Sequence, residues 1–431
     1  MKKLFACLMA GALLTGCAAE SNDTETGTEG STTEKEVITV WAWDKNFNIP
    51  VMEEAAKVYE AAHENVDIEI VDYAREDIET KLHTTLSTGS TKNLPDIVLV
   101  EDYAAQKFLT SYPGMFADLT GKIDHDSFAP YKVAPMTVDN AIYGVPFDSG
   151  IAAMFYRTDI LEEAGYTAED LQDITWDEYL TIGADVYEKT GKYIMGENLN
   201  EMSGIIRIML QSAGSWYFDE TGQVTITDNE AMIEAFEIIK EMKDSQTVVN
   251  TNGWDAWVGA MNDGSVASVV TGAWIMGSIT AAPDQSGLWA VAPLPRLSTV
   301  DSVNASNLGG SSWYVLADKE TNETAIDFLD ETFGAHEEFY QTILTNVGAI
   351  GTYIPAQDGA AYGEPSEFFS NQTIYKDFST WMQAVPEVNY GVYVGEADQA
   401  VHSVMPAFMA GDLTVEEALQ QVEDTINNQI K

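Results

Sequence analysis

Between residues 37 and 108 the spacing of apolar positions changes repeatedly between two periods. Val37 to Trp43 is an unbroken apolar run, which predicts a strand buried on both faces. Apolar residues then recur every three or four positions from Val51 to Ala62, which predicts an amphipathic helix. The same alternation continues with a strand at 66–71, a helix over 78–86 and a strand at 95–100. Strands and helices that alternate at this spacing favour a parallel sheet in an α/β protein.

The rest of the chain predicts a second set of α/β elements. The segment 143–150 is rich in Pro and Gly, and we interpret it as a crossover between two domains, followed by an apolar strand from Ile151 to Tyr156. Thr175 is a candidate N-cap for the next helix. Further crossovers are expected at 307–316 and 348–357, further strands at 266–270 and 289–294, and further helices at 176–188, 203–213, 229–243, 324–333 and 414–430.

The N-terminal segment has the pattern of a secretion signal. Lys2 and Lys3 precede an apolar run from Leu4 to Leu14, which is too short to span a bilayer. The next residues, Leu14-Thr15-Gly16-Cys17, resemble the cleavage box of bacterial lipoproteins, in which the cysteine is acylated. We therefore expect a signal peptide at 1–16 and a lipid (palmitate) on Cys17. A flexible polar tether over 17–36 would connect this membrane anchor to the folded part, on the extracytoplasmic face of the cell membrane.

Charge and cysteine content exclude several classes of function. The formal net charge is −48, from 21 Lys and Arg against 69 Asp and Glu, so the chain would repel nucleic-acid backbones. Cys7 and Cys17 are the only cysteines, which leaves no disulfide and no cysteine-based zinc site after processing. The five histidines are scattered, and no phosphate loop or G-x-S-x-G motif is present. No cofactor, no metal and no nucleic-acid partner are expected.

Polar residues follow two of the predicted parallel strands. Trp43 and Asp44 end the first strand, and Glu101 and Asp102 end the third. Ligands of open α/β sheets bind outside the carboxyl ends of the strands, so these residues are candidates for a ligand site.

The same mixture of indoles with acids and amides occurs elsewhere and is typical of sugar binding. An indole covers the apolar face of a sugar ring, while carboxylates and amides bind its hydroxyl groups. The alternative for each Trp is ordinary packing in the core or between domains. The candidates in loop-like contexts, each beside Gly, Ser, Asn or Asp, are Trp216, Trp254, Trp274 and Trp313, and Asp148 is a further acid next to an aromatic residue.

Seven stretches, in this order, resemble the extracellular solute-binding lipoproteins of carbohydrate ABC importers, the maltose-binding-protein-like kind. They are ITVWAWD at 38–44, LPDIVLVEDY at 94–103, YGVPFDSGIAAMFYRTDILEEAG at 143–165, TWDEY at 175–179, TGAWIMGSI at 271–279, WAVAPLPR at 289–296 and NLGGSSWYVL at 307–316. The resemblance implies that Asp148 binds ligand hydroxyls and that Trp274 is a stacking platform. It also implies that Gly310, Ser311 and Trp313 line the hinge side. The aromatic context adds Tyr353, whose segment 351–359 departs from relatives.

The resemblance implies an α/β fold of two lobes, each a mixed, mostly parallel sheet flanked by helices. We expect residues 37–147 and 309–350 in the N-terminal lobe, and 148–308 and 351–431 in the C-terminal lobe. The implied function is to capture a sugar, expected to be an oligosaccharide, between the lobes and deliver it to a membrane permease, as a monomer and without catalysis. Two alternatives remain: a secreted glycoside-cleaving enzyme, and a binding protein for a polyamine or cationic peptide.

Overall fold

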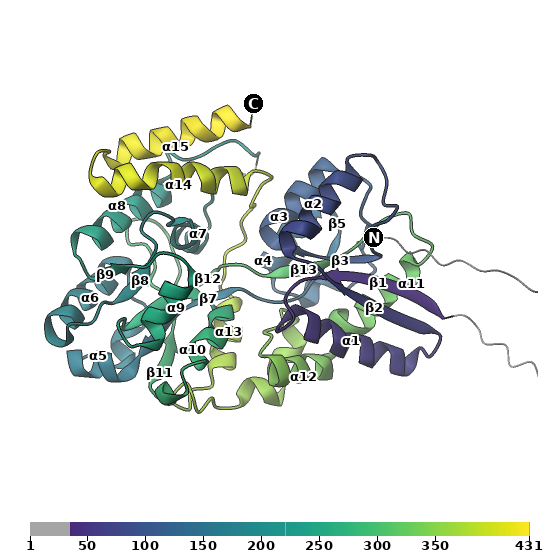
Figure 1. Cartoon of the computed structure of the whole chain (residues 1–431), viewed down its shortest axis with the longest axis horizontal. Coiled ribbons are helices and arrows are strands. Elements are labelled where there is room, and N and C mark those ends of the chain that lie inside the picture. The colour runs from purple at the N-terminus through teal and green to yellow at the C-terminus, as the bar shows by residue number, and fades with distance from the viewer. Residues whose placement is uncertain (1–34, 220, 431) are drawn as a thin grey trace, which may run out of the picture. The chain divides into compact units, whose positions relative to one another are not determined.

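The computed structural model describes residues 35–219 and 221–430. The predicted signal peptide, Cys17 and most of the predicted tether lie outside the described residues. Within them, no helix is both long and apolar enough for a bilayer crossing. The described residues form two main sheets with helices packed on them, the arrangement expected for a two-lobed binding protein (Figure 1).

The first sheet confirms the parallel strands predicted from the N-terminal pattern. Its strand order is β2-β1-β3-β13-β6. β1 pairs in parallel with both β2 and β3, whereas β13 runs antiparallel to β3 and β6. The strands are β1 (Glu36–Ala42), β2 (Val66–Asp72), β3 (Ile97–Glu101), β6 (Gly144–Pro146) and β13 (Ser311–Val315). The crossovers of the predicted βαβ units are supplied by α1 (Asn48–Ala62) and α2 (Arg75–Leu86).

Helices of the first set bury their apolar faces on this sheet. In α1, Val51, Met52 and Ala55 are fully buried, at the helical spacing seen in the sequence. The helices of this set are α1 (Asn48–Ala62), α2 (Arg75–Leu86), α3 (Asp102–Ser111), α11 (Asn322–Leu329) and α12 (Glu337–Val347). A short helix, α4 (Pro130–Val133), and a small hairpin of β4 (Thr137–Val138) and β5 (Ala141–Ile142) precede β6.

The second sheet departs from the expected mostly parallel pairing. Its centre is β7 (Ile151–Arg157), which is buried along its whole length, and its partner strands among the described residues all run antiparallel to it. These partners are β10 (Ser268–Gly272), β11 (Trp289–Ala292) and β12 (Ser306–Asn307). A buried apolar run such as β7 has the same sequence pattern in either pairing, so the direction of its neighbours was not readable from the pattern. A separate parallel pair joins β8 (Met195–Glu197) to β9 (Val248–Asn250).

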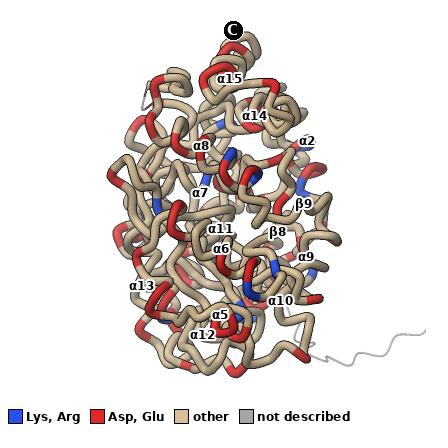
Figure 2. The backbone as a smooth tube through the Cα atoms, turned by 90° about the vertical axis from the view of Figure 1, so that its left-hand side faces the viewer, with Lys and Arg blue, Asp and Glu red and all other residues tan. Residues whose placement is uncertain are grey.

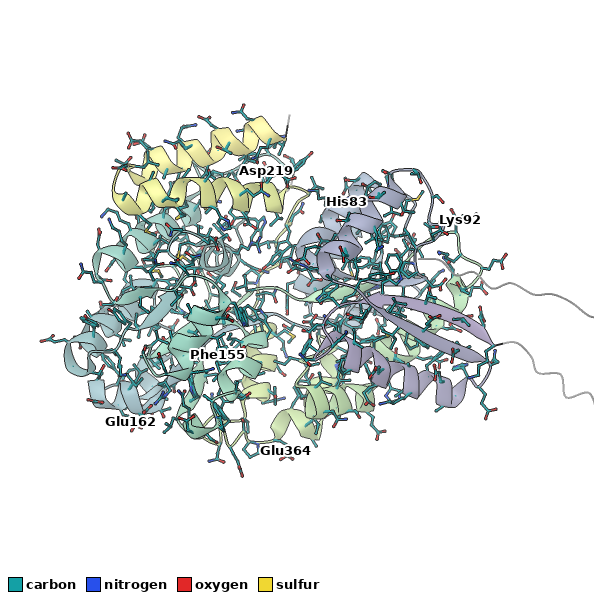
Figure 3. The ribbon with its side chains drawn as sticks, viewed as in Figure 1. His83, Lys92, Phe155, Glu162, Asp219 and Glu364 are labelled. Atoms are coloured by element: carbon teal, nitrogen blue, oxygen red, sulfur yellow. The ribbon has the colours of Figure 1, made fainter. Side chains whose placement is uncertain are left out.

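The second set of helices packs around β7 and its partners. Phe155 lies in the interior, while Glu162 on α5 is exposed (Figure 3). Thr175 caps α6 as predicted, because its Oγ1 accepts a hydrogen bond from the Glu178 backbone N–H. The helices are α5 (Thr158–Ala164), α6 (Trp176–Thr190), α7 (Ser203–Ser212), α8 (Glu230–Asp244), α9 (Trp254–Asn262), α10 (Met276–Thr280), α13 (Ile374–Met382), α14 (Val394–Ala410) and α15 (Val415–Gln429).

The chain passes between the two sheets at 147–150 and again at 308–310, as it connects β6 to β7 and β12 to β13. Lys132 connects the two passages, because its buried ammonium group donates to the carbonyl oxygens of Asp148 (2.7 Å) and Ser311 (3.0 Å). A bridge between Asp148 and Gly351 brings the segment after α12 to the same place. The exact lobe boundaries stay a prediction.

Candidate functional site

A pocket opens at one end of the second sheet, where several strands terminate. β8 and β9 run in parallel and end side by side at Glu197 and Asn250. Thr251 follows β9 directly, and its backbone N–H donates to the Glu197 carbonyl at 2.9 Å. β10 ends at Gly272, and Trp274 lies in the short helical turn that follows. These strand ends therefore bring side chains from distant parts of the chain to one cavity of about 240 Å³.

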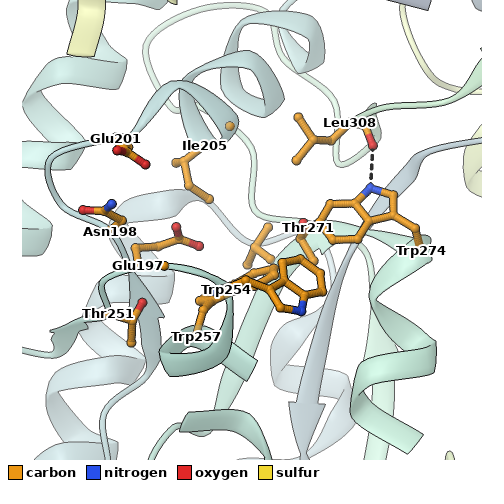
Figure 4. A pocket seen from close by; sticks show the side chains of 13 residues that line it. Glu197, Asn198, Glu201, Ile205, Thr251, Trp254, Trp257, Thr271, Trp274 and Leu308 are labelled. Atoms are coloured by element: carbon orange, nitrogen blue, oxygen red, sulfur yellow. Dashed lines mark hydrogen bonds between the residues drawn. The ribbon is translucent and has the colours of Figure 1, made fainter. Parts of the chain in front are cut away.

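Three indoles form the aromatic wall of the pocket. Trp254 and Trp257 project from α9, and the ring of Trp254 lies 6.0 Å from that of Trp274 with an angle of 29° between their planes (Figure 4). Trp254 is 54% exposed and Trp274 is 42% exposed. Large aromatic surfaces are costly to leave in water, so exposed indoles that line a cavity indicate a ligand face.

Hydrogen bonds to backbone carbonyls fix two of these indoles in place. The Trp274 Nε1–H donates to the Leu308 carbonyl, and the Trp257 Nε1–H donates to the Gly196 carbonyl, each at 2.8 Å. Gly272 leaves the space that Trp274 needs, since a Cβ atom there would lie 2.2 Å from the Trp274 Nε1. The Trp274 ring is therefore held in position before a ligand binds.

The opposite wall of the pocket is polar and acidic. Figure 4 shows Glu197 at the end of β8, with its carboxyl group directed toward the indoles, and Asn198 and Glu201 farther along the same wall. Burial raises the pKa of Glu197 to about 8, against the opposing effect of the Asn198 backbone N–H and the Trp257 indole N–H. Carboxyl and amide groups that face indoles across a cavity can bind hydroxyl groups while the indoles cover an apolar face.

The comparisons with known proteins give the family. The model of the bacterial extracellular solute-binding proteins matches residues 54–376, about three quarters of the chain. The chain belongs to this family. This solute-binding protein is 44% identical over 430 residues to the lactose-binding protein of Rhizobium radiobacter, and the match covers 100% of this chain and 98% of the relative.

Two further matches are a relative and a solved structure. An arabinooligosaccharide-binding protein of Bacillus subtilis (strain 168) is 28% identical over 352 residues, which cover 78% of each chain. A crystal structure described as an extracellular solute-binding protein family 1 has a TM-score of 0.78 at 21% identity, and the match covers 92% of this chain and 100% of that one. The latter match shows the fold alone.

Of the residues singled out in the sequence, Trp254 and Trp274 lie together in this pocket. Glu197, Asn198, Glu201, Thr251 and Trp257 also line the pocket, and none of them was predicted as a site residue from the sequence. Glu197 follows Ile194, Met195 and Gly196, so the rule that ligands bind at the carboxyl ends of strands would have identified it if the short strand β8 had been predicted.

Asp102, Asp148 and Ser311 lie together at the passages between the sheets. Asp102 is 1% exposed; it accepts hydrogen bonds from the Lys132 ammonium group at 2.5 Å and from the Ser312 hydroxyl at 2.8 Å. Burial raises the pKa of Asp102 to about 6, although the Lys132 charge opposes that shift. Asp148 accepts from the backbone N–H and the hydroxyl of Ser311 at 2.7 and 2.9 Å. A Cβ on Gly310, at φ +95°, would lie 2.9 Å from Asp102.

Three of the predicted aromatic residues are in the interior. Trp313 is fully buried beside Phe147, and Tyr353 is buried against Tyr340. Trp216 is 3% exposed and stacks on Tyr103 with 5.9 Å between ring centres. The two indoles therefore fit the alternative of ordinary core packing that the sequence left open, and Tyr353 is packed in the same way.

The remaining candidates lie at strand ends of the first sheet. Trp43 is partly buried and packs against the core there. Asp44 is exposed in a turn at φ +68°, where its carboxylate accepts a hydrogen bond from the Asn46 backbone N–H at 2.9 Å. Glu101 forms an ion pair with Arg75. None of these three side chains is among the residues that line the indole pocket.

Proposed function

We propose that this protein binds a lactose-like galactoside in the pocket of Trp254, Trp257 and Trp274. At the coarser level, the chain is the carbohydrate-binding component of an ABC import system. The observation that carries the specific proposal is the pair of exposed indoles, Trp254 and Trp274, that face carboxyl groups across one cavity. The apolar face of a galactose ring suits such a platform, while its hydroxyl groups suit the opposite wall.

Lactose is favoured over an arabinooligosaccharide by the degree of similarity. The identity to the lactose-binding relative is 44% over the full chain, against 28% over 78% of the chain for the arabinooligosaccharide-binding relative.

The other parts of the proposal concern location and mode of action. As a member of the extracellular solute-binding family, the chain acts outside the cytoplasmic membrane. We propose that a lipid on Cys17 anchors it there, that it acts as a monomer, and that it releases the sugar unaltered to a permease. Asp44, Glu101 and Asp148 stay proposed as contacts from the side of the first sheet. The lobe boundaries at 147–148, 308–309 and 350–351 are proposed as the places where closure over the ligand occurs.

Titration calorimetry with lactose, arabinooligosaccharides and maltose tests the proposal. We expect lactose to bind most tightly and Trp274→Ala to weaken lactose binding at least tenfold. Trp381→Ala is the matched control, since Trp381 is a partly buried indole on α13 outside the pocket. Equal lactose binding by wild type and Trp274→Ala would place the site elsewhere, and absence of lactose binding would reject the ligand. Glucose released from lactose at a steady rate would favour the enzyme alternative instead.

A further inference from the structure

We propose that Glu197 selects the ligand of this pocket: its carboxyl group stays protonated and donates a hydrogen bond to an oxygen of a neutral sugar. This inference rests on the proposed sugar site. Glu197 extends from the end of β8 toward the indoles (Figure 4). A protonated carboxyl group offers one donor and acceptor capacity, whereas an ionised carboxylate only accepts. The protonation state therefore decides which ligand atoms can face this side chain.

The surroundings of Glu197 give its charge no counter-ion, and the N–H groups of Asn198 and Trp257 offset the effect of burial only in part. The described residues that line the pocket include no Lys, Arg or His. They include Ile205 and Val270, which are both buried, and the three indoles. An ionised carboxylate in such a wall loses hydration without gaining a cation, so the neutral form is favoured. Asp102 shows the alternative in this same chain, since its buried carboxyl group lies 2.5 Å from the Lys132 ammonium group.

Thr251 supplies a second, independent indication of a ligand. Its side-chain oxygen is buried at the pocket wall and has no hydrogen-bond partner in the described structure. Thr251 is also the backbone neighbour of Glu197 across the ends of β8 and β9. A buried hydroxyl without a partner is costly, and a ligand hydroxyl would satisfy it. Glu197 and Thr251 thus offer hydrogen-bond donors and acceptors to the same part of a sugar ring.

The titratable groups around Glu197 leave a pH range in which its own ionisation can be observed. Glu201 lies on the same wall but is exposed. Burial raises the pKa of Tyr179 on α6, and the charge of Glu197 raises it further. On α9 the titratable side chain is the exposed Asp255, which is outside the pocket lining. Burial lowers the pKa of His402 on α14 from 6.5, and the charge of Glu201 opposes this shift. Above pH 7 the titration of Glu197, with its pKa of about 8, dominates this set.

The test is the pH dependence of lactose affinity between pH 7 and 9, measured by calorimetry on the wild type and two variants. Because only the protonated form donates, the wild-type affinity should fall about tenfold over this range, given a pKa of about 8. Glu197→Gln keeps a donor that does not titrate, so its affinity should be independent of pH whatever its absolute value. Glu201→Gln is the matched control and should keep the wild-type slope.

The outcomes separate this inference from the proposed function. If the wild type binds lactose with an affinity that is flat from pH 7 to 9, or if Glu197→Gln keeps the slope, the selection by Glu197 is rejected while the sugar site remains. An affinity for spermidine that rises with pH would also reject it, since that pattern requires an ionised Glu197 beside a cation. If no variant and no wild-type sample binds lactose at pH 7, the proposed function itself fails. Circular dichroism of each variant establishes that the comparison is made between folded proteins.

Discussion

Asp102 and Glu197 are both carboxyl groups with raised pKa values, but they belong to different kinds of surroundings. Asp102 is fully enclosed, with Lys132 and Ser312 as partners. Glu197 faces a cavity, with indoles in front of it and no cation in the pocket lining that the structure describes. The protein therefore supplies Asp102 with a cation and a hydroxyl donor, whereas the carboxyl group of Glu197 is left to interact with a ligand. A raised pKa alone does not show whether a carboxyl group stabilises the fold or binds a ligand. The groups that surround the carboxyl group distinguish the two cases.

The indoles show the same contrast. Trp313 and Trp216 are buried among other rings, whereas Trp254 and Trp274 are among the most exposed large apolar side chains described. The charge distribution adds little to this distinction, because Figure 2 shows acidic residues spread over the helices in view rather than gathered at one place. No group of three or more His, Cys, Asp or Glu side chains in the described part of the chain could hold a metal ion.

The largest effect is expected from Lys132→Met, which removes the cation beside Asp102. A buried carboxylate without its partner costs about 3–5 kcal/mol, and the carbonyl groups of Asp148 and Ser311 also lose their donor. Urea unfolding measures the loss. Lys57→Met is the control, since the Lys57–Glu54 pair is exposed to solvent and its loss should change the stability far less. Equal losses in both variants would show that Asp102 does not depend on its partner.

Trp274→Ala and Trp216→Ala should separate recognition from packing. Trp274 is 42% exposed, so its removal should weaken sugar binding at least tenfold, about 1.4 kcal/mol, and leave the melting temperature of the free protein nearly unchanged. Trp216 is 3% exposed and packs on Tyr103 and Tyr390, so its removal should cost about 3–5 kcal/mol of stability. Calorimetry and thermal unfolding of both variants test this. A large fall in melting temperature for Trp274→Ala would mean that this indole is structural.

Glu197 should also make stability depend on pH. Its pKa is raised from 4.5 to about 8 on folding, so the folded state holds a proton that the unfolded state has released. The stabilising contribution is therefore complete below about pH 4.5 and is lost as the pH rises toward 8. Between pH 6.5 and 8, above the pKa of about 6 for Asp102, wild type should lose about 1 kcal/mol more than Glu197→Gln. Parallel stability curves for the two proteins would contradict the shift.

The first sheet was predictable because the apolar positions of its strands and helices repeat with distinct spacings over long segments. The predicted strands 37–43 and 66–71 differ from β1 and β2 by at most one residue at either end. The direction of the strands around β7 was not predictable, since an unbroken apolar run suits both parallel and antiparallel neighbours.

The candidate site was only partly predictable, because spacing does not reveal burial. Trp274 and Trp313 occur in similar loop-like sequences, yet one is 42% exposed and the other is fully buried. Glu197 was missed because β8 has three residues, too few for a period to be recognised. The contact that defines its environment, with Thr251, joins strands that are far apart in the sequence.

The smallest effect is expected from salt, and it sharpens the difference between the two carboxyl groups. If Glu197 is neutral in the pocket and the ligand is a neutral sugar, raising the salt from about 50 to 500 mM should change the lactose affinity less than about twofold, because there is no charge pair to screen. A cationic ligand held by ionised Glu197 and Glu201 would bind far more weakly at high salt. Calorimetry at pH 7 with lactose and with spermidine distinguishes these cases. A strong salt dependence for lactose would show that an ionised group takes part, and Glu197 would then resemble Asp102 more than its surroundings indicate.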